Sequence, residues 1–151
     1  MREIVREAVK DSNSLDQVRD NLFIVFRRLQ NEGHKKIGYV SGLITSEGPE
    51  NIGKNIKRLT RFTDQIRSQS EFPVFGPTDV FDDALFRRLE ANGFHNADWM
   101  VFWQEVLSGN GTPYVTDIYM TPRWKTSQGS VDEHKTAQAV GMEIHYLEKE
   151  V

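Results

Sequence analysis

The segment from Ser127 to Glu133 (Ser-Gln-Gly-Ser-Val-Asp-Glu) places small residues and an acid where a strand gives way to a helix. A strand-like run, Asp117-Ile118-Tyr119-Met120, precedes it, and a helix is predicted over residues 129–140. Such a turn leaves backbone N–H groups unpaired, and these suit an anion or a sugar hydroxyl. Glu133 falls in the first turn of the predicted helix. The residues that share its helical face are small or apolar: Ser130, Ala137 and Val140.

Two interpretations of Glu133 follow from this pattern. An acid in the first turn of a helix commonly complements the helix dipole. A carboxylate that faces the protein's own sheet, however, costs free energy unless it has a partner or a task. The second interpretation is therefore that Glu133 is catalytic.

Composition limits the functions that the chain can have. Its 151 residues suggest one domain with a sizeable core, and 38% hydrophobic and 27% charged residues fit an ordinary soluble globule. A net charge of -3 argues against a polymeric nucleic acid as partner, because binding phosphates needs a basic surface. The absence of cysteine excludes disulfides, thiolate metal sites and a Cys nucleophile. No apolar run is long enough for a membrane span, and the charged N-terminus lacks the apolar core of a signal peptide, so we expect a cytoplasmic protein without membrane contact.

Strand and helix patterns alternate along the chain. The predicted elements are helices over 2–10, 15–29, 49–66, 80–92, 97–107 and 129–140, and strands over 36–42, 72–77, 114–120 and 142–147. This alternation predicts an α/β domain with a parallel sheet of four to five strands flanked by helices. In such sheets ligands bind beyond the carboxyl ends of the strands, where the strand order switches. Ser41-Gly42 and Ser127-x-Gly129 both follow a strand, so we expect the two loops to lie side by side.

Residues 1–33 are predicted to form a helical extension that precedes the α/β domain of residues 34–151. Within it, apolar residues from Leu15 to Leu29 recur at helical period, and Phe23 and Ile24 lie beside that stripe. This is more apolar surface than a helix packed on one side needs, which predicts a homo-oligomer. A purely structural assembly protein built on these helices is a further possibility.

The pair of loops resembles those of the nucleoside 2-deoxyribosyltransferase superfamily. The matching motifs are Tyr39-Val40-Ser41-Gly42-Leu43-Ile44-Thr45 and Ser127-x-Gly129-x-x-x-Glu133, together with the run from Asp117 through Trp124 to Ser127. The superfamily includes the 2'-deoxynucleoside 5'-phosphate N-hydrolases and small bacterial and phage relatives. The resemblance covers roughly residues 36–148 and implies a Rossmann- or flavodoxin-like fold. It also implies an N-glycosidase or deoxyribosyltransferase that acts on a small nucleoside or nucleotide without a metal or cofactor.

The resemblance also assigns catalytic roles. In that superfamily a helix glutamate attacks the anomeric carbon and forms a glycosyl-enzyme ester, much as in a retaining glycosidase, and Glu133 matches it. A tyrosine on the first strand orients the nucleophile, and Tyr39 matches that tyrosine, although core packing is an alternative role. A second acid assists the leaving base. Glu105 is the nearest candidate by position and Asp98 the other, although both also suit a solvated helical face.

Substrate contacts are implied on both loops. The residues expected to contact the sugar or a phosphate are Ser41, Gly42, Leu43, Ile44, Thr45, Ser127, Gly129 and Ser130, and Trp124 is expected either to stack on a base or to pack. Leu43 and Thr45 replace a Ser and an Arg of the hydrolases, so a free nucleoside is as well suited as a monophosphate. The alternative function is a non-catalytic module that binds a nucleotide or nucleotide sugar.

Metal ligands are not suggested by the spacing of the histidines. The four histidines are scattered along the chain: His34, His95, His134 and His145. None of them forms a pair or triplet at metal-ligand spacing, so we predict no metal site.

Overall fold

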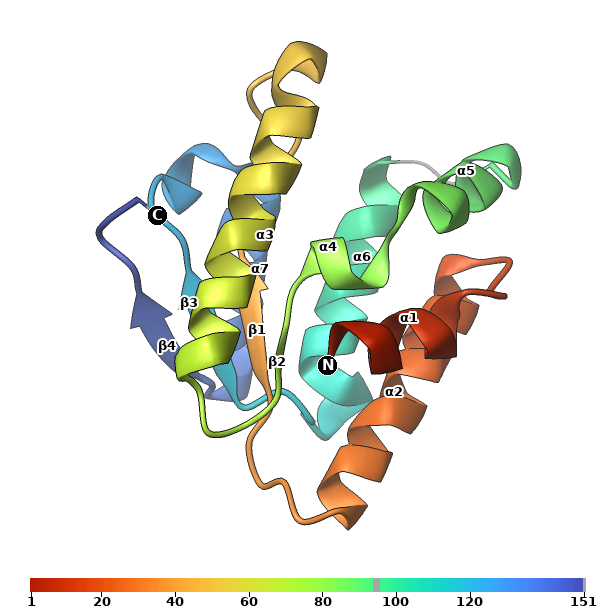
Figure 1. Ribbon diagram of the computed structural model, residues 1–151, viewed down its shortest axis with the longest axis vertical. Coiled ribbons are helices and arrows are strands. Elements are labelled where there is room, and N and C mark those ends of the chain that lie inside the picture. The colour runs from red at the N-terminus through yellow and green to blue at the C-terminus, as the bar shows by residue number, and fades with distance from the viewer. Residues whose placement is uncertain (94–95, 151) are drawn as a thin grey trace.

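The computed structural model describes residues 1–93 and 96–150 and shows an α/β fold around one parallel sheet (Figure 1). The four strands are β1 Gly38–Ser41, β2 Val74–Phe75, β3 Asp117–Met120 and β4 Glu143–Tyr146. They are ordered β2-β1-β3-β4, and each neighbouring pair is parallel. The predicted Rossmann- or flavodoxin-like architecture is confirmed, with four strands.

The strand order switches between β1 and β3. The chain leaves β1 toward β2 on one side and later adds β3 on the other side of β1. In the β1–β3 pair, Gly38 lies opposite Asp117 and Ser41 lies opposite Met120. The loops that follow Ser41 and Met120 therefore leave the sheet next to each other, at the position where open α/β sheets bind ligands.

Two helices precede the first strand, and the other helices lie in the connections between the strands. Their bounds are α1 Arg2–Val9, α2 Leu15–Asn31, α3 Ile52–Gln69, α4 Pro77–Val80, α5 Asp83–Ala91, α6 Asn96–Ser108 and α7 Gln128–Val140, with 3-10 turns at Pro49–Asn51, Gly109–Gly111 and Trp124–Thr126. Among the helices of residues 1–93 and 96–150, none is both long and apolar enough to cross a bilayer.

Several predicted boundaries differ from the observed ones, and two of the differences have clear local reasons. The strand predicted over 72–77 is only Val74–Phe75, because Pro77 begins α4, and proline suits the first turn of a helix. The helix predicted from residue 80 begins at Asp83. It does so because the Asp82 carboxylate accepts the Leu85 N–H as an N-cap.

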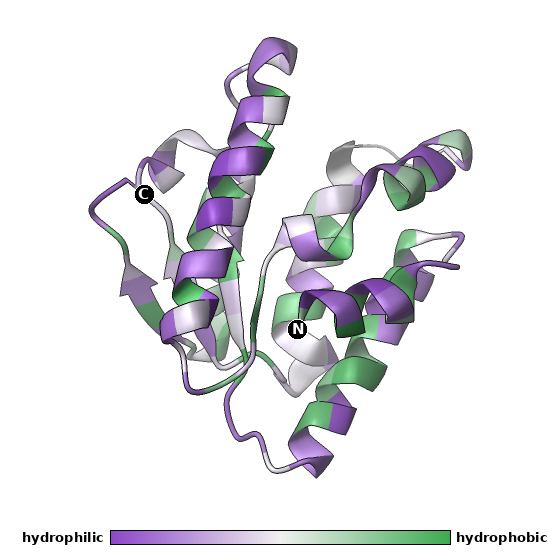
Figure 2. Cartoon of the chain, in the orientation of Figure 1, coloured by the Kyte–Doolittle hydropathy of each residue, from purple (hydrophilic) through white to green (hydrophobic). Residues whose placement is uncertain are grey.

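The sheet is covered on both faces. Helix α3 packs on one face, where the buried side chains are Val40, Leu59, Phe62, Ile66 and Val74. The opposite face of the sheet presents Tyr39, Phe75, Ile118 and Met120 to a larger core, to which α1, α2, α5, α6 and α7 contribute. Figure 2 shows that these helices carry both apolar and polar residues, as amphipathic helices do. Tyr39 and Ser41 therefore lie on one face of the sheet, and α3 lies on the other.

The two N-terminal helices belong to the same core as the sheet. Val5, Val18, Leu22 and Phe26 are fully buried in it. At the start of α2, the Ser14 hydroxyl accepts the Gln17 N–H as an N-cap, and the Gln17 side chain accepts the Asn13 N–H at 2.8 Å. Residues 1–33 are thus packed on the α/β part of the chain.

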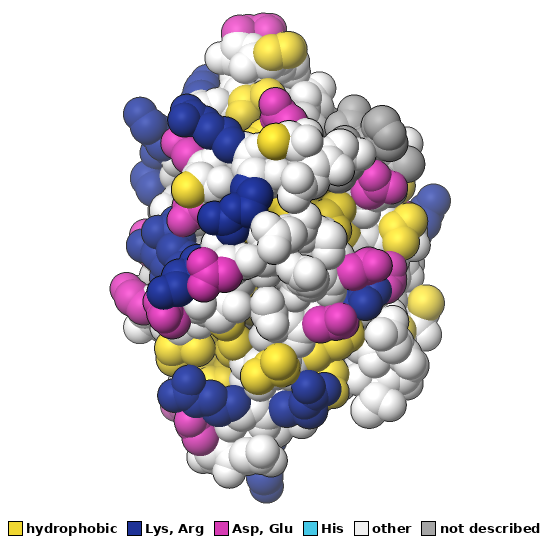
Figure 3. Space-filling model, turned by 90° about the vertical axis from the view of Figure 1, so that its right-hand side faces the viewer, with side chains coloured by type: hydrophobic (Ala, Val, Ile, Leu, Met, Phe, Trp, Pro, Cys, Tyr) yellow, Lys and Arg dark blue, Asp and Glu magenta, His cyan; other side chains and the backbone are white. Residues whose placement is uncertain are grey.

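Much of the apolar surface of α2 is used inside the chain. Phe23 is buried, and its ring lies 5.4 Å from the ring of Tyr114. Ile24 is 55% exposed. Figure 3 shows hydrophobic side chains reaching the surface in several places among charged ones. The homo-oligomer stays a prediction. It is supported by Ile24, an exposed hydrophobic residue beside the apolar stripe of α2.

A buried carboxylate joins three helices on the sheet's β2 side. Asp79 in α4 is fully buried and forms ion pairs with Arg2 of α1, at 3.0 Å, and with Arg67 of α3. Its second oxygen also accepts the Gly76 N–H at 3.0 Å. Because a buried charge needs such partners, Asp79 fixes α1 and α4 against α3.

We predict that Asp79→Asn lowers the free energy of unfolding by about 3 kcal/mol, because two guanidinium groups lose their shared charge partner. Asp64 is the matched control, since it pairs with the same two arginines but is half-exposed. Asp64→Asn should cost less than about 1 kcal/mol. Urea unfolding of the two variants measures the difference, and equal costs would contradict the structural role of Asp79.

Candidate functional site

Serine side chains join the two predicted loops. The Ser41 hydroxyl, at the end of β1, donates to the Ser130 hydroxyl of α7 at 3.0 Å. Ser127 is the N-cap of α7, and its hydroxyl accepts the Ser130 N–H at 3.2 Å. The Thr121 hydroxyl, just after β3, donates to the Ser41 carbonyl at 2.8 Å. The structure thus brings Ser41, Ser127 and Ser130 together at the switch in strand order.

Glu133 lies in the second turn of α7, not in the first turn as predicted. The helix begins at Gln128, one residue before the predicted start, and it has no acid in its first turn. The influence of a helix dipole falls off within that turn, so dipole complementation does not account for Glu133. Its side chain is buried, with 9% exposure. The carboxylate therefore needs an explanation within the site.

The surroundings of Glu133 make it titrate near neutral pH. Burial raises the pKa of Glu133 to about 7, although the hydroxyls of Tyr39 and Ser41 act in the opposite direction and lower it. The charge of Asp132 adds a smaller increase to the pKa. Burial and the Glu133 charge raise the pKa of Tyr39 well above its usual value, so Tyr39 keeps its proton at neutral pH. The site pairs a carboxylate of shifted pKa with a hydroxyl donor.

The Tyr39 hydroxyl is buried without a hydrogen-bond partner in the described part of the chain. It lies near enough to Glu133 to affect that pKa, yet the two side chains do not meet ordinary hydrogen-bond geometry. Phe75 and Trp103 hold the Tyr39 ring, with centroids at 5.3 and 4.9 Å. An unsatisfied buried hydroxyl costs about 1–3 kcal/mol. Such a group beside a carboxylate of perturbed pKa is typical of a functional site.

Gly129 leaves room next to the Glu133 carboxylate. A methyl group at Gly129 would meet only Ser127 Oγ at 3.9 Å and Glu133 Oε2 at 4.0 Å. At Gly42, in contrast, a methyl group would lie 2.6 Å from Thr121 Oγ1. Gly42 is therefore required for close packing of the loop, whereas a methyl group at Gly129 would make only ordinary contacts with polar atoms of the site.

Helix α3 fixes the loop after β1. The Leu43 side chain is fully buried, so it does not face a ligand. The Ile44 carbonyl accepts a hydrogen bond from the Asn55 side chain at 3.1 Å. Among the predicted contacts of this loop, Thr45 is the one with an exposed side chain. Any substrate contact made by Leu43 must therefore come from its backbone, whereas the Ile44 side chain is partly buried.

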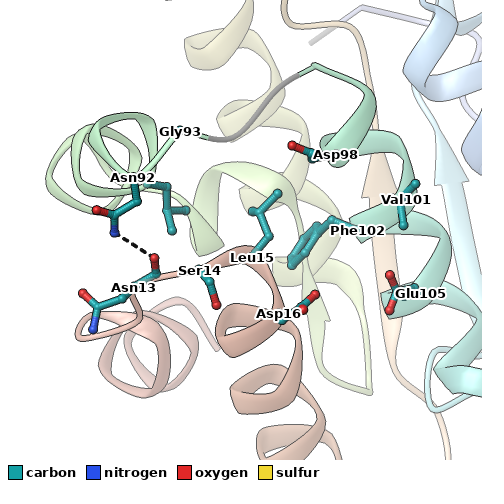
Figure 4. A pocket seen from close by; sticks show the side chains of 11 residues that line it. Asn13, Ser14, Leu15, Asp16, Asn92, Gly93, Asp98, Val101, Phe102 and Glu105 are labelled. Carbon is teal, nitrogen blue, oxygen red and sulfur yellow. Dashed lines mark hydrogen bonds between the residues drawn. The ribbon is translucent and has the colours of Figure 1, made fainter.

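The structure does not bring the two predicted second acids to Glu133. Glu105 forms an ion pair with Arg19 of α2, and both Glu105 and Asp98 line a cavity of about 290 Å³ between α2, α5 and α6 (Figure 4). Trp103, which contacts Tyr39, precedes Glu105 by two residues. Two residues correspond to about 200° of helix rotation, so Glu105 points away from the Tyr39 side. The assignment of Glu105 or Asp98 as the second acid is not supported.

Trp124 packs on the same edge of the sheet. Its ring stacks on His134 at 4.3 Å, and His134 Nε2 lies 2.7 Å from the Tyr146 hydroxyl. Burial, followed by the charge of Lys125, lowers the pKa of His134, so this ring is neutral at pH 7. One face of Trp124 is thus used for packing inside the chain, which fits the packing role predicted as its alternative to base stacking.

A second polar cluster lies at the opposite, amino end of the strands, and the sequence patterns did not reveal it. Ligand atoms of Asp117, Glu143 and His145 lie within 4.8 Å of one another. The buried Asp117 carboxylate already accepts from His145 at 2.8 Å and pairs with Lys36 at 3.2 Å. The Asp117 carboxylate is therefore already paired within the chain, and we assign the cluster no ligand. His95, one of the four histidines in the sequence, lies outside the described residues.

Comparison with models of known protein families, with curated proteins and with solved structures finds no match for this chain. The function must therefore be argued from the site itself. Its chemistry is that of a buried carboxylate, close to half ionised at pH 7, with an unused hydroxyl donor beside it.

The raised pKa of Glu133 predicts a pH dependence of stability. Between the ordinary pKa of 4.5 and the folded value of about 7, the folded state binds more protons than the unfolded state. The free energy of unfolding should therefore fall as pH rises through that window, by up to about 3 kcal/mol. Glu133→Gln should remove this slope and be more stable than the wild type at pH 8.

Urea unfolding at pH 5 and pH 8 measures this effect. Asp132→Asn is the matched control, because Asp132 is the neighbouring acid on α7 but accepts hydrogen bonds from the Gln104 amide instead of facing the sheet. This variant should keep most of the wild-type slope. A wild-type slope that Glu133→Gln leaves unchanged would mean that Glu133 titrates normally.

Proposed function

We propose that this protein cleaves or transfers at the N-glycosidic bond of a nucleoside or nucleotide, with Glu133 as nucleophile and Tyr39 as its orienting partner. The observation that carries the proposal is the Glu133 carboxylate, buried at the switch in strand order beside the unpartnered Tyr39 hydroxyl. The resemblance of the two loops to the nucleoside 2-deoxyribosyltransferase superfamily supports it. A small-molecule substrate, a cytoplasmic location and a homo-oligomer are parts of the same proposal.

The reaction has two steps. The ionised Glu133 carboxylate attacks the anomeric carbon, and the base leaves with the electron pair of the N-glycosidic bond and takes up a proton from solvent. A water molecule or a second base then attacks the anomeric carbon of the ester. The sugar–carboxylate bond breaks, and Glu133 is regenerated as carboxylate.

Burial of Glu133 favours this chemistry. The transition state carries positive charge on the sugar, and a nearby carboxylate stabilises that charge more strongly in a low dielectric than in water. The Tyr39 hydroxyl remains protonated and can donate to the carboxylate as it moves toward the substrate. A pKa of about 7 leaves close to half of the enzyme in the reactive, ionised form at neutral pH.

The second candidate function is a non-catalytic module that binds a nucleotide or nucleotide sugar. The position of Glu105 favours it, because its ion pair with Arg19 leaves the departing base without the predicted acid. Release of a base distinguishes the two functions. The binding module would retain its ligand unchanged, whereas the enzyme would produce free base.

We predict that Glu133→Gln abolishes base release. The measurement incubates the protein with a panel of nucleosides and nucleotides and detects the free base by chromatography. The change keeps the shape of the side chain but removes its nucleophilicity, and loss of a nucleophile costs on the order of 4–8 kcal/mol in the barrier. Glu133→Ala should regain part of its activity with azide or formate, which can enter the vacated space. Near-wild-type turnover by Glu133→Gln would refute the covalent mechanism. If the wild type binds a member of the panel without cleaving it, the binding module is the correct function.

We also predict that Gly129→Ala reduces base release at least about tenfold, because the methyl group fills the space beside Glu133. Gly53→Ala is the matched control. Gly53 lies in the first turn of α3, and a methyl group there meets no atom within 4 Å. Both changes place alanine in a helix and should raise the melting temperature or leave it unchanged. Equal activity of the two variants would show that substrate does not approach Glu133 past Gly129.

A further inference from the structure

Two arginines converge on one carboxylate at the carboxyl edge of the sheet. Arg58 extends from α3, and its guanidinium is only 6% exposed. Its Nε and Nη2 atoms donate to the two carboxylate oxygens of Glu150 at 2.7 and 2.8 Å. Nη2 also donates to the Pro122 carbonyl, in the loop after β3, at 2.8 Å. This places the guanidinium beside the loops that leave the switch in strand order.

Arg123 adds a second guanidinium to the same carboxylate. Its backbone is in the left-handed region, with φ at 66°, and its Nη2 donates to Glu150 Oε1 at 3.3 Å. Its Nη1 donates to Glu47, in the loop after β1, at 3.0 Å. Glu150 thus receives hydrogen bonds from two cations that come from different elements. Arg58 and then Arg123 lower the pKa of Glu150, so this carboxylate is an anion at neutral pH.

The geometry of this contact is that of anion recognition. A side-on guanidinium that donates from two nitrogens to two oxygens is the arrangement in which arginine binds carboxylate and phosphate groups. Glu150 occupies the position that such a ligand would take. It is half-exposed and belongs to the segment after β4, whereas Arg58 is held within the fold by Pro122 and by the ring of Phe62, 4.9 Å away.

Arg58 also has a donor that Glu150 does not satisfy. Its Nη1 atom is buried and has no hydrogen-bond partner among residues 1–93 and 96–150. Arginine has five donor hydrogens and cannot lose its charge in a protein, so this nitrogen keeps an unmet requirement for an acceptor. A ligand on the Nε and Nη2 edge does not reach this nitrogen, so the preference for phosphate rests on the number of acceptors: a carboxylate offers two oxygens to the two converging guanidiniums, whereas a phosphate group offers three or four.

We propose that Arg58 and Arg123 form a binding site for the phosphate group of a small molecule, and that Glu150 fills this site as an internal anion until the ligand displaces it. The site lies on the α3 side of the sheet, whereas Tyr39 and Ser41, which lie beside Glu133, are on the other face. The proposal does not depend on the glycosidic chemistry of Glu133.

Calorimetric titration with sodium pyrophosphate at low ionic strength tests the proposal, with inorganic phosphate and acetate as parallel ligands. Glu150→Gln removes the charge that competes with the ligand for the two arginines. The site should then be free of its internal anion in a larger fraction of the molecules, so the apparent Kd for pyrophosphate should fall by about fivefold. Arg123→Gln should raise that Kd at least about tenfold, because one of the two cations is lost. Arg123 is half-exposed, so the fold should tolerate this change. Glu148→Gln, an exposed acid of the same segment, should bind as the wild type does.

The Nε–H signal of Arg58 in an NMR spectrum gives the site-specific readout and should shift on titration with pyrophosphate. Pyrophosphate affinity that is equal in the wild type, Glu150→Gln and Arg123→Gln would overturn the proposal. So would the absence of binding to both the wild type and Glu150→Gln, or acetate affinity equal to that of inorganic phosphate. Because Glu133→Gln should leave pyrophosphate binding unchanged, a failure of this site is distinguishable from a failure of the proposed function.

Discussion

The candidate site depends on the burial of one carboxylate, that of Glu133, against the face of the sheet that carries Tyr39 and Ser41. A buried carboxylate is costly, and its pKa of about 7 expresses that cost. A glutamine in the same position would avoid it. Proteins commonly accept such a loss of stability where a group of perturbed pKa has a chemical role. The unpartnered Tyr39 hydroxyl adds a second cost at the same place.

The parallel sheet is what allows these groups to meet. Because β1 and β3 are neighbours, the residues that follow them leave the same edge, and the hydrogen bond between Ser41 and Ser130 then joins β1 to α7. Gly42 permits close contact with Thr121, whereas a methyl group at Gly129 would come no closer than 3.9 Å to Ser127 and 4.0 Å to Glu133. Two glycines that look alike in the sequence thus differ in how tightly they are packed.

The features that depend on local pattern could be predicted from the sequence. Alternating strand and helix signals gave the parallel α/β class, and helical spacing placed Glu133 on an inward face with Ser130 and Ala137, all three of which are buried. The start of α7 was predicted one residue too late, and Glu133 was assigned to the first turn although it is the sixth residue of the helix. Helix ends depend on side-chain caps such as that of Ser127, which patterns locate only approximately.

The features that depend on distant partners could not be predicted. Glu105 faces α2 because Arg19, which lies 86 residues earlier, pairs with it. The cluster of Asp117 and His145 requires the register of β3 and β4, which no local signal supplies. The convergence of Arg58 and Arg123 on Glu150 likewise joins α3, the loop after β3 and the segment after β4. In each case the sequence shows a charged residue, and only the fold determines what it contacts.

The glycosyl-enzyme ester on Glu133 is the species that distinguishes an enzyme from a binding module. Intact-protein and peptide mass spectrometry after incubation with nucleosides and nucleotides fluorinated at the 2' position, which slows breakdown of such an ester, would detect it directly. The account predicts a mass increase of one fluorinated sugar, with or without its phosphate, on the peptide that contains Glu133, and no such increase in Glu133→Gln. An adduct on another residue, or release of base from the panel with no adduct at Glu133, would contradict it.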